Sequence, residues 1–354
     1  MCSGQLARQP ACCLRPHNHM ITIKHIARKL NLSVSTVGRA LTDHPRISRE
    51  TKERVNIAAT ELGYIANAAA RMMRGGSSHL IGLLVPDIRS TFYSTVAHVL
   101  SKTFKREGFH LSLSITDDDR NAESQQAREL IGARVAGIVI VPCAVPKRET
   151  IELVRMVPHA QLLRRNSSLG DWFGLDDERA IFDATNDLFN LGHRRIGYIG
   201  DTIYPTGKAR YKGFRKAHAA AGLKLDESLA ELGPPDTRFG EDAITRLLTK
   251  KPTAIITSSV LVTLAAADRL MLLKVNVPGD LSLIGFGDGP WQKWWGPGLT
   301  TMHLPAEELA TECGHWLLNR VKEKRLHTGG TAHQAVIPIE RILRGSTAPP
   351  KGAI

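Results

Sequence analysis

The chain has 354 residues, of which 42% are hydrophobic and 23% are charged, and its formal net charge is +13. This length predicts two or three domains, and the composition is typical of a folded, water-soluble protein. No apolar run is long enough to cross a membrane, which excludes an integral membrane protein. The five cysteines match neither a disulfide framework nor a zinc site, so we expect a reducing, cytoplasmic location.

Residues 1–20, MCSGQLARQPACCLRPHNHM, form an irregular leader. The leader lacks the uninterrupted apolar stretch of a signal peptide. A helical pattern begins at Met20, so an over-extended start codon would explain these residues.

Positive charge is concentrated near the N-terminus. Residues 1–74 contain twelve Lys/Arg and four Asp/Glu, whereas residues 75–354 contain 35 and 30. A small basic head on a nearly balanced body favours a polyanion-binding module. A solvated charged tail is the alternative, but the basic residues alternate with apolar residues at helical spacing, which argues against it.

Residues 21–66 predict three short helices, with Thr22, Ser33 and Ser48 as their N-caps. Each helix carries an apolar stripe at helical spacing. The stripes consist of Ile23, Ile26, Ala27 and Leu30, then Val37, Ala40 and Leu41, then Val55, Ala58, Ala59 and Leu62. Two short helices joined by a tight turn and followed by a third predict a helix-turn-helix head.

The segments "TIKHIARKLNLSVSTVGRAL" and "RISRETKERVNIAATELGYIANAAARMMR" resemble the DNA-binding head of the lactose-repressor/galactose-repressor (LacI/GalR) family. The family pattern is T-[LI]-x-[DE]-[VI]-A-x-x-A-G-V-S-x-x-T-V-S-R-x-L, followed by G-Y-x-P-N-x-x-A-R-x-L. The chain departs from this pattern at His25, Leu30, Asn31, Gly38, Ala66 and Met73. The hydrophobic frame is kept, although Gly38 costs on the order of 1 kcal/mol of helix stability relative to Ala.

The resemblance implies that the second helix lies in the major groove and that Val34, Ser35 and Arg39 contact base edges. Arg39 can donate two hydrogen bonds to guanine. Val34 either contacts a thymine methyl group or packs against Leu30, and the sequence leaves both open. The predicted DNA-binding residues are Thr22, Ser33, Val34, Ser35, Thr36, Arg39, Asn67, Ala70, Arg71 and Met73.

Residues 67–78 predict a hinge helix and a linker. "NAAARMMR" is marginal as an isolated helix because it is so short, and Gly75-Gly76-Ser77-Ser78 follows it. The resemblance implies that this helix forms on DNA, pairs with that of a second subunit, and inserts Met73 into the minor groove. The alternative is a flexible linker in which Met72 and Met73 merely pack.

Residues 79–345 alternate strand and helix patterns. The strand segments are "LIGLLVPDI", "FHLSLSIT", "VAGIVIVP", "HRRIGYIGD", "TAIITSS" and "DLSLIGFG". This repetition predicts an α/β core of parallel, doubly wound sheets. The family resemblance extends over residues 21–345 and implies a two-lobed core like that of periplasmic sugar-binding proteins. We assign the N-lobe to 79–175 and 304–333, the C-lobe to 176–303 and 334–345, and a tail to 346–354.

In such folds, ligands bind beyond the carboxyl ends of the strands, in the crevice between the lobes. The resemblance places effector contacts at Asp87, Ser90, Phe92, Arg164, Arg210, Phe239, Ser258 and Asp288, with Thr91, Ser259, Gly287 and His303 beside them.

Sugar-responsive members of the family have acids where this chain has Arg164, Ser259 and Gly287. We therefore expect Arg164 and Arg210 to face one another near Asp288 and to bind an anionic effector, such as a sugar acid or a phosphorylated sugar. A pocket that has lost its ligand would change in the same direction, and the sequence leaves both explanations open.

The sequence lacks the signatures of an enzyme. "YPTGKA" fails as a phosphate-binding loop, and neither H-E-x-x-H nor G-x-S-x-G occurs. The histidines show no ligand spacing, and Asp117-Asp118-Asp119 is expected to be a solvated loop rather than a cation site. We therefore predict no catalytic residues, no metal and no cofactor.

The combined features predict a cytoplasmic, homodimeric transcription regulator, expected to be a repressor of metabolic genes. Its partners would be a pseudo-palindromic, double-stranded operator and a small-molecule effector, with no membrane partner. A sugar-binding protein without DNA activity is the alternative, and the helix-turn-helix head argues against it. The tail has no heptads, so nothing predicts a coiled-coil tetramer.

Overall fold

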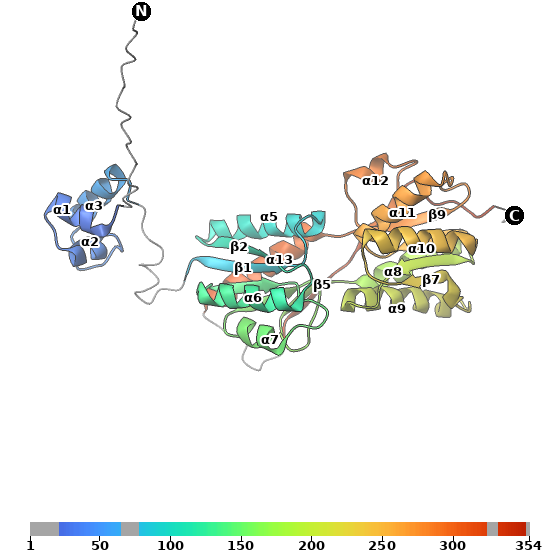
Figure 1. Cartoon of the computed structure of the whole chain (residues 1–354), viewed down its shortest axis with the longest axis horizontal. Coiled ribbons are helices and arrows are strands. Elements are labelled where there is room, and N and C mark those ends of the chain that lie inside the picture. The colour runs from blue at the N-terminus through green and yellow to red at the C-terminus, as the bar shows by residue number, and fades with distance from the viewer. Residues whose placement is uncertain (1–20, 65–77, 324–331, 352–354) are drawn as a thin grey trace, which may run out of the picture. The chain divides into compact units, whose positions relative to one another are not determined.

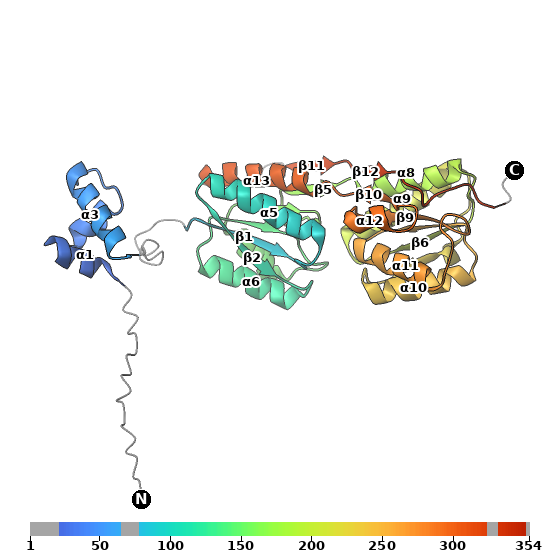
Figure 2. The same cartoon turned by 90° about the horizontal axis from the view of Figure 1, so that it is seen from above.

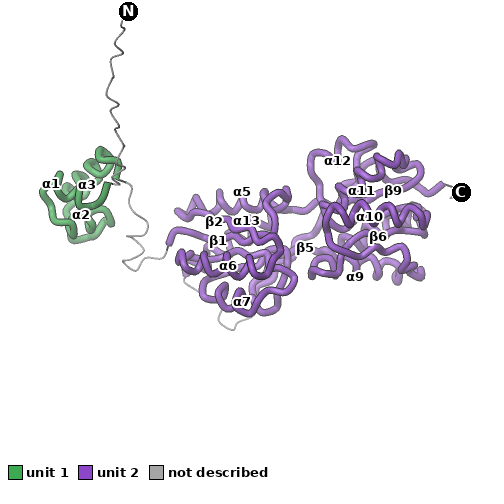
Figure 3. The backbone as a smooth tube through the Cα atoms, viewed as in Figure 1, with its two compact units in different colours: residues 1–76 green, residues 77–354 purple. Residues whose placement is uncertain are grey.

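The computed structural model describes residues 21–64, 78–323 and 332–351. The chain divides into two compact units, residues 1–76 and 77–354 (Figure 3). The leader and most of the predicted hinge, including Asn67, Ala70, Arg71 and Met73, lie outside the described residues. In the described part, no helix is long and apolar enough to span a bilayer.

The first unit consists of the helices α1 (Ile23–Leu30), α2 (Val34–Ala40) and α3 (Arg49–Glu61). Their predicted apolar stripes meet in one core, in which Ile26, Val37 and Val55 are fully buried. Leu30, Leu41 and Leu62 pack against this core as half-buried side chains. The predicted three-helix head is confirmed.

Side-chain caps begin the helices where the sequence predicted them. Ser33 Oγ accepts a hydrogen bond from the Thr36 N–H at 3.0 Å, and Ser48 Oγ accepts one from the Thr51 N–H at 3.3 Å. The Thr22 N–H donates to His25 Nδ1 at 3.0 Å. His25 therefore makes the contact that a Glu or Gln makes in a capping box, and this departure from the family pattern leaves the start of α1 intact.

The N-lobe is built on a six-stranded parallel sheet in the order β11-β5-β4-β3-β1-β2. Its strands are β1 (Leu80–Val85), β2 (His110–Ile115), β3 (Gly137–Ile140), β4 (His159–Leu162), β5 (Trp172–Leu175) and β11 (Gln334–Ile337). Helices α5 (Thr91–Arg106) and α13 (Ala306–Lys322) cover one face of the sheet, and α6 (Arg120–Gly132) and α7 (Arg148–Val154) cover the other (Figures 1 and 2).

The C-lobe repeats this arrangement with a six-stranded sheet in the order β12-β10-β9-β8-β6-β7, in which β12 alone runs antiparallel. Its strands are β6 (Ile196–Gly200), β7 (Ala230–Leu232), β8 (Ala254–Thr257), β9 (Ser282–Phe286), β10 (Thr300–His303) and β12 (Glu340–Ile342). Its helices are α8 (Asp177–Asn190) and α9 (Pro205–Ala220) on one face, α10 (Thr237–Thr249) and α11 (Val260–Leu272) on the other, and the short α12 (Pro290–Trp294) and η1 (Glu227–Leu229) in connections. Two doubly wound lobes were predicted, and the fold confirms them.

The chain crosses between the lobes after β5, after β10 and after β11. The last crossing corrects the predicted boundary, because Gln334–Ile337 pairs in parallel with Trp172–Leu175 and so belongs to the N-lobe. The pairing joins segments about 160 residues apart, so the sequence pattern did not show which sheet this edge strand joins. Leu304 and Ile339, in two of the crossings, pack against the hydrophobic cores of both lobes.

The segment expected to be a tail is packed on the C-lobe as far as Ala348. Ser346 is fully buried, and its Oγ donates to the Leu283 carbonyl at 2.6 Å and accepts from the Thr300 N–H at 2.8 Å. The Ala348 carbonyl accepts from His193 Nε2 at 2.9 Å and from Ser282 Oγ at 3.0 Å. The C-lobe therefore extends beyond residue 345.

Ser346→Ala is expected to lower the free energy of unfolding by about 1–3 kcal/mol, because the Leu283 carbonyl and the Thr300 N–H lose a buried partner. Urea denaturation of the full chain measures this change. The neighbouring half-buried Thr347 is the matched control, and Thr347→Ala should stay within about 0.5 kcal/mol of the parent. Equal losses in the two variants would show that Ser346 is not an anchor.

Candidate functional site

The α2 helix presents Val34, Ser35 and Arg39 on the surface of the head. Val34 is 49% exposed, which favours its availability to DNA over packing against Leu30. Ser35 and Arg39 are one helical turn apart and therefore share a face. Among the described residues, no carboxylate pairs with Arg39, so its guanidinium is free to bind another partner.

Hydroxyl groups gather where α2 begins. Ser33 Oγ lies 2.8 Å from both Ser35 Oγ and Thr36 Oγ1. Thr22 occupies the corresponding position before α1 and is exposed. Hydroxyl side chains of this kind contact DNA phosphates and fix the register of a protein on the duplex.

Three side chains meet where the two lobes face each other, and we call them the interlobe cluster: Asp118, Arg164 and Tyr204. Arg164 donates to both carboxylate oxygens of Asp118, with Nη2 to Oδ2 at 3.1 Å. The Arg164 guanidinium also lies over the Tyr204 ring, 3.7 Å from its centroid. Burial raises the pKa of the Tyr93 hydroxyl, and the charges of Arg164 and Asp118 act on it in opposite directions.

These residues come from the carboxyl ends of strands in both lobes. Asp118 follows β2, Arg164 follows β4, and Tyr204 is the N-cap of α9 in the connection after β6. This is the edge at which ligands bind in doubly wound folds. The Arg164 side chain is only 10% exposed, so its charge is held almost out of water.

Arg210, on α9, is buried within the C-lobe. Its Nε donates to Asp177 Oδ1 at 2.7 Å, and its Nη1 donates to the Ser258 carbonyl at 2.8 Å. Its guanidinium lies 3.9 Å from the centroid of the Phe286 ring. No hydrogen bond joins Arg210 Nη2 to a described residue, which leaves this nitrogen as a donor for a ligand.

The charge balance at this edge differs from the sequence-based expectation. Asp118 and Asp177, which the sequence did not assign to the site, each neutralise one of the two arginines. Asp118 was expected in a solvated loop, but its side chain is 28% exposed and is paired. Each arginine is therefore neutralised by a carboxylate. The excess positive charge from which the anionic effector was predicted is absent.

Asp288 is bound to the C-terminal segment rather than to Arg164 or Arg210. Arg344 donates to its two carboxylate oxygens at 2.7 and 3.0 Å, and Thr301 Oγ1 donates to it at 2.9 Å. Burial acts to raise the pKa of Asp288, but Arg344 and Thr301 outweigh it and hold the pKa below its usual value. The carboxylate of Asp288 is thus already satisfied by this chain.

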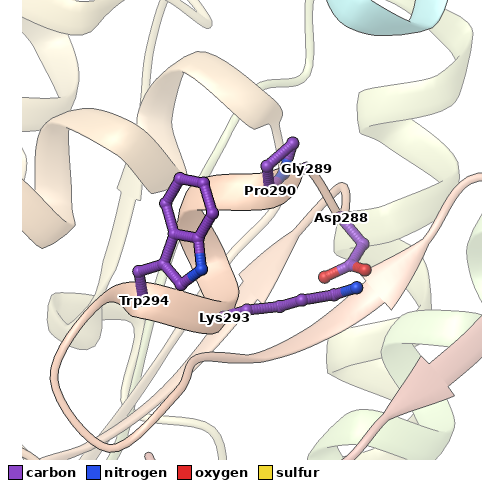
Figure 4. A pocket seen from close by; sticks show the side chains of 5 residues that line it. All are labelled: Asp288, Gly289, Pro290, Lys293 and Trp294. Carbon is purple, nitrogen blue, oxygen red and sulfur yellow. The ribbon is translucent and has the colours of Figure 1, made fainter.

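An open pocket of about 500 Å³ adjoins Asp288 and is lined by Asp288, Gly289, Pro290, Lys293 and Trp294 (Figure 4). Figure 4 shows the Lys293 ammonium extending toward the side of the pocket that carries the Asp288 carboxylate. Trp294 is 80% exposed. The sequence did not predict this feature, because nothing in the pattern around α12 marks an exposed tryptophan.

The other predicted effector residues are dispersed. Asp87 pairs with Arg89 at 2.9 Å, Ser90 is the N-cap of α5, and Phe92 packs in the core of the N-lobe. Phe239 lies against Gly233, with its ring 5.8 Å from the Arg246 guanidinium, and Ser258 is fully buried. Among the described residues, Ser258 thus contacts Arg210, whereas the contacts of Phe239 and Asp288 are with other residues.

Comparison with known proteins matches both units. Residues 22–67 match the family model of bacterial regulatory proteins, lacI family, and residues 185–347 match the model of a periplasmic binding protein-like domain. The chain is 30% identical to the transcriptional regulator GalR of Salmonella typhimurium (strain SL1344), over 84% of this chain and 89% of GalR.

Solved structures show the same fold. The lac repressor dimer bound to operator and the anti-inducer ONPF superposes with a TM-score of 0.80 at 20% identity, covering 93% of this chain and 99% of that one. A complex of the transcriptional regulator CelR with cellobiose has a TM-score of 0.68 at 23% identity, covering 92% and 99%. With its helix-turn-helix head and its two-lobed core, the chain belongs to the LacI family of DNA-binding transcriptional regulators and is not an enzyme.

Proposed function

We propose that this protein is a cytoplasmic, homodimeric repressor of metabolic genes that binds a pseudo-palindromic operator and responds to a small-molecule effector held between its lobes. The observation that carries the proposal is the exposure of Val34, Ser35 and Arg39 on α2 of a well-packed three-helix head. Arg39 would contact guanine, Val34 a thymine methyl group, and Thr22, Ser33 and Thr36 the phosphates. Contacts by Asn67, Ala70, Arg71 and Met73 stay predictions from the sequence.

A gel shift of the full chain with fragments of its own genome tests DNA binding. We expect a small set of fragments to be retained in the presence of excess nonspecific DNA. Base contacts add binding free energy to the salt-dependent attraction to phosphates, which is the same for every sequence. No retention would favour a sugar-binding protein without DNA activity. Equal retention of all fragments would contradict sequence-specific binding.

The proposed dimer uses exposed apolar side chains of both lobes, which we call the dimer face: Leu113 and Ile115 of β2, Leu261 and Leu272 of α11, and Trp294 of α12. β2 is the edge strand of its sheet, and Leu261 and Leu272 fall on one stripe of α11. Figure 1 shows α5 along the upper side of the N-lobe, with β2 in the sheet beneath it, and α11 with α12 along the upper side of the C-lobe. Exposed apolar positions that extend over both lobes mark an interaction surface, and the lac repressor is a dimer in its operator complex.

Trp294→Glu is expected to raise the dimer dissociation constant by roughly ten- to a hundredfold, since an exposed tryptophan is a typical hot spot and a buried glutamate would be unpaired. Analytical ultracentrifugation measures this change. Met156→Glu is the matched control, because Met156 is 60% exposed but follows α7, on the face of the N-lobe sheet opposite α5. Unchanged association of Trp294→Glu would contradict this dimer face.

For the effector, we propose an uncharged, polyhydroxylated molecule rather than the anion that Arg164 and Arg210 predicted. Each arginine is already paired with a carboxylate, whereas Arg210 Nη2 offers a donor, and Asp118 and Asp177 offer acceptors for hydroxyl groups. The solved complex of CelR contains cellobiose, a neutral sugar. Asp87, Ser90, Phe92 and Phe239 stay proposed contacts, whereas Asp288 and Ser258 would act indirectly, through their bonds to Arg344 and Arg210.

A thermal-shift screen that pairs neutral sugars with their acid and phosphorylated counterparts tests this class. We expect a neutral compound to raise the melting temperature of the parent chain. Stabilisation by the acid or phosphate counterparts alone would overturn the proposal and restore the anionic effector.

A further inference from the structure

The Arg164–Tyr204 contact joins the two lobes through side chains rather than through the crossing strands. Arg164 belongs to the N-lobe and Tyr204 to the C-lobe, and the guanidinium lies 3.7 Å from the ring centroid. The next residue offers an internal comparison, because Arg165 lies 5.6 Å from the Trp172 ring and donates to Gln334 Oε1 at 3.2 Å, both within the N-lobe. Of these two neighbouring arginines, Arg164 is the one that bridges the lobes.

The N-lobe side of this contact is held by an unusual backbone. Asp117, Asp118 and Leu163 have φ values of 50°, 56° and 61°, in the left-handed region that non-glycine residues rarely adopt. Such strain persists where surrounding interactions over-determine the conformation, and it clusters at functional sites. Here it places the Asp118 carboxylate against the Arg164 guanidinium, which is fixed by two hydrogen bonds.

The C-lobe side is equally well fixed. Asp201 Oδ1 accepts hydrogen bonds from the Ile203 and Tyr204 N–H groups, both at 3.0 Å, and Asp201 is buried. Gly207 makes room for this carboxylate, because a Cβ there would lie 2.3 Å from it. The start of α9 is thus held in place, and Tyr204 presents its ring to the opposite lobe.

We propose that Arg164, positioned by Asp118 and stacked on Tyr204, is an interlobe latch that holds the lobes closed before any effector binds. A guanidinium over an aromatic ring is attracted to the electron-rich face, and the attraction grows as water is excluded; here the Arg164 side chain is 10% exposed and Tyr204 is half-buried. The latch has a regulatory consequence. A molecule that enters between the lobes would have to break or replace the Arg164–Tyr204 contact.

Hydrogen–deuterium exchange of the full chain, without DNA or effector, tests the latch. Tyr204→Ala is expected to speed exchange of the amides in 117–119 and 203–207 by roughly tenfold, the factor that corresponds to loss of one partly desolvated cation–π contact. Tyr204→Phe keeps the ring and loses only the hydroxyl, which interacts with Asp118, so it should accelerate exchange less than Tyr204→Ala. Arg165→Ala is the control on the neighbouring arginine and should leave these amides unchanged.

Arg164→Lys is a second, independent variant, because lysine keeps the charge opposite Asp118 but loses the planar group that stacks. It is expected to speed exchange of the same amides and thereby support the latch even if Tyr204→Ala fails to fold. Parent-like exchange in Arg164→Lys, or in a folded Tyr204→Ala, would overturn the proposal. Equal acceleration by Tyr204→Phe or by Arg165→Ala would also overturn it.

Discussion

Arg39→Ala is expected to abolish the preference for one base pair in each operator half-site. The free energy of discrimination that is lost is about 1–3 kcal/mol per contact. The side chain is exposed on α2, and no carboxylate in the described part of the chain competes for it. Binding to the best operator should therefore weaken, while binding to an operator changed at that base pair should hardly change. Competition assays with single-base operator variants measure both effects.

Arg49→Ala is the matched control within the same unit. Arg49 is an equally charged side chain on α3, 93% exposed, and it pairs with Glu53 at 3.0 Å. Its removal should alter affinity for all sequences alike, because a phosphate or solvent-facing charge carries no base preference. If Arg39→Ala kept the full base preference of the parent, α2 would not be the recognition helix.

Arg210→Met is expected to lower the free energy of unfolding by about 3–5 kcal/mol and to remove the effector response. The Arg210 and Asp177 side chains are 8% and 5% exposed, so loss of the arginine leaves a buried carboxylate without its counter-ion. Arg179→Ala breaks the exposed pair with Asp183 and should cost no more than about 1 kcal/mol. Denaturant titrations of the two variants measure the difference.

The double variant Arg210→Met/Asp177→Leu separates stability from ligand binding. Removing both buried charges should restore most of the lost stability, because a well-packed apolar pair often replaces a buried ion pair without loss. The effector response should stay absent, since the Nη2 donor is gone. A double variant that regained the thermal shift with effector would exclude Arg210 as a ligand contact.

The head was predictable because its information is local. Ser33 and Ser48 cap their helices as the pattern indicated, and apolar residues recur at helical spacing across three short segments. The buried strands with long apolar runs were predictable for the same reason. Strands β4, β5, β7, β10, β11 and β12 were not predicted. Strands β3 and β8 are equally short, but they consist of the nearly continuous apolar runs GIVI and AIIT, whereas polar residues interrupt most of the others.

The site was predictable only in part. Arg164 and Arg210 could be named from their places in the family pattern, but their partners could not. Asp118 is 46 residues from Arg164, Asp177 is 33 from Arg210, and Arg344 is 56 from Asp288. Such pairings depend on strand order and on the backbone conformation of the connecting loops, which a periodic pattern does not encode. The neutralised charges of the interlobe cluster therefore emerged only from the fold.

Selection of operators from a random pool of double-stranded DNA, using the full chain, tests whether this protein binds a two-fold symmetric operator. We expect an enriched inverted repeat, with two half-sites about one helical turn apart or less, because two identical heads related by two-fold symmetry each read one half-site. The parent chain should select this repeat, and Arg39→Ala should lose one conserved position from both halves. Recovery of no enriched sequence, or of a single asymmetric site, would contradict binding to a two-fold symmetric operator.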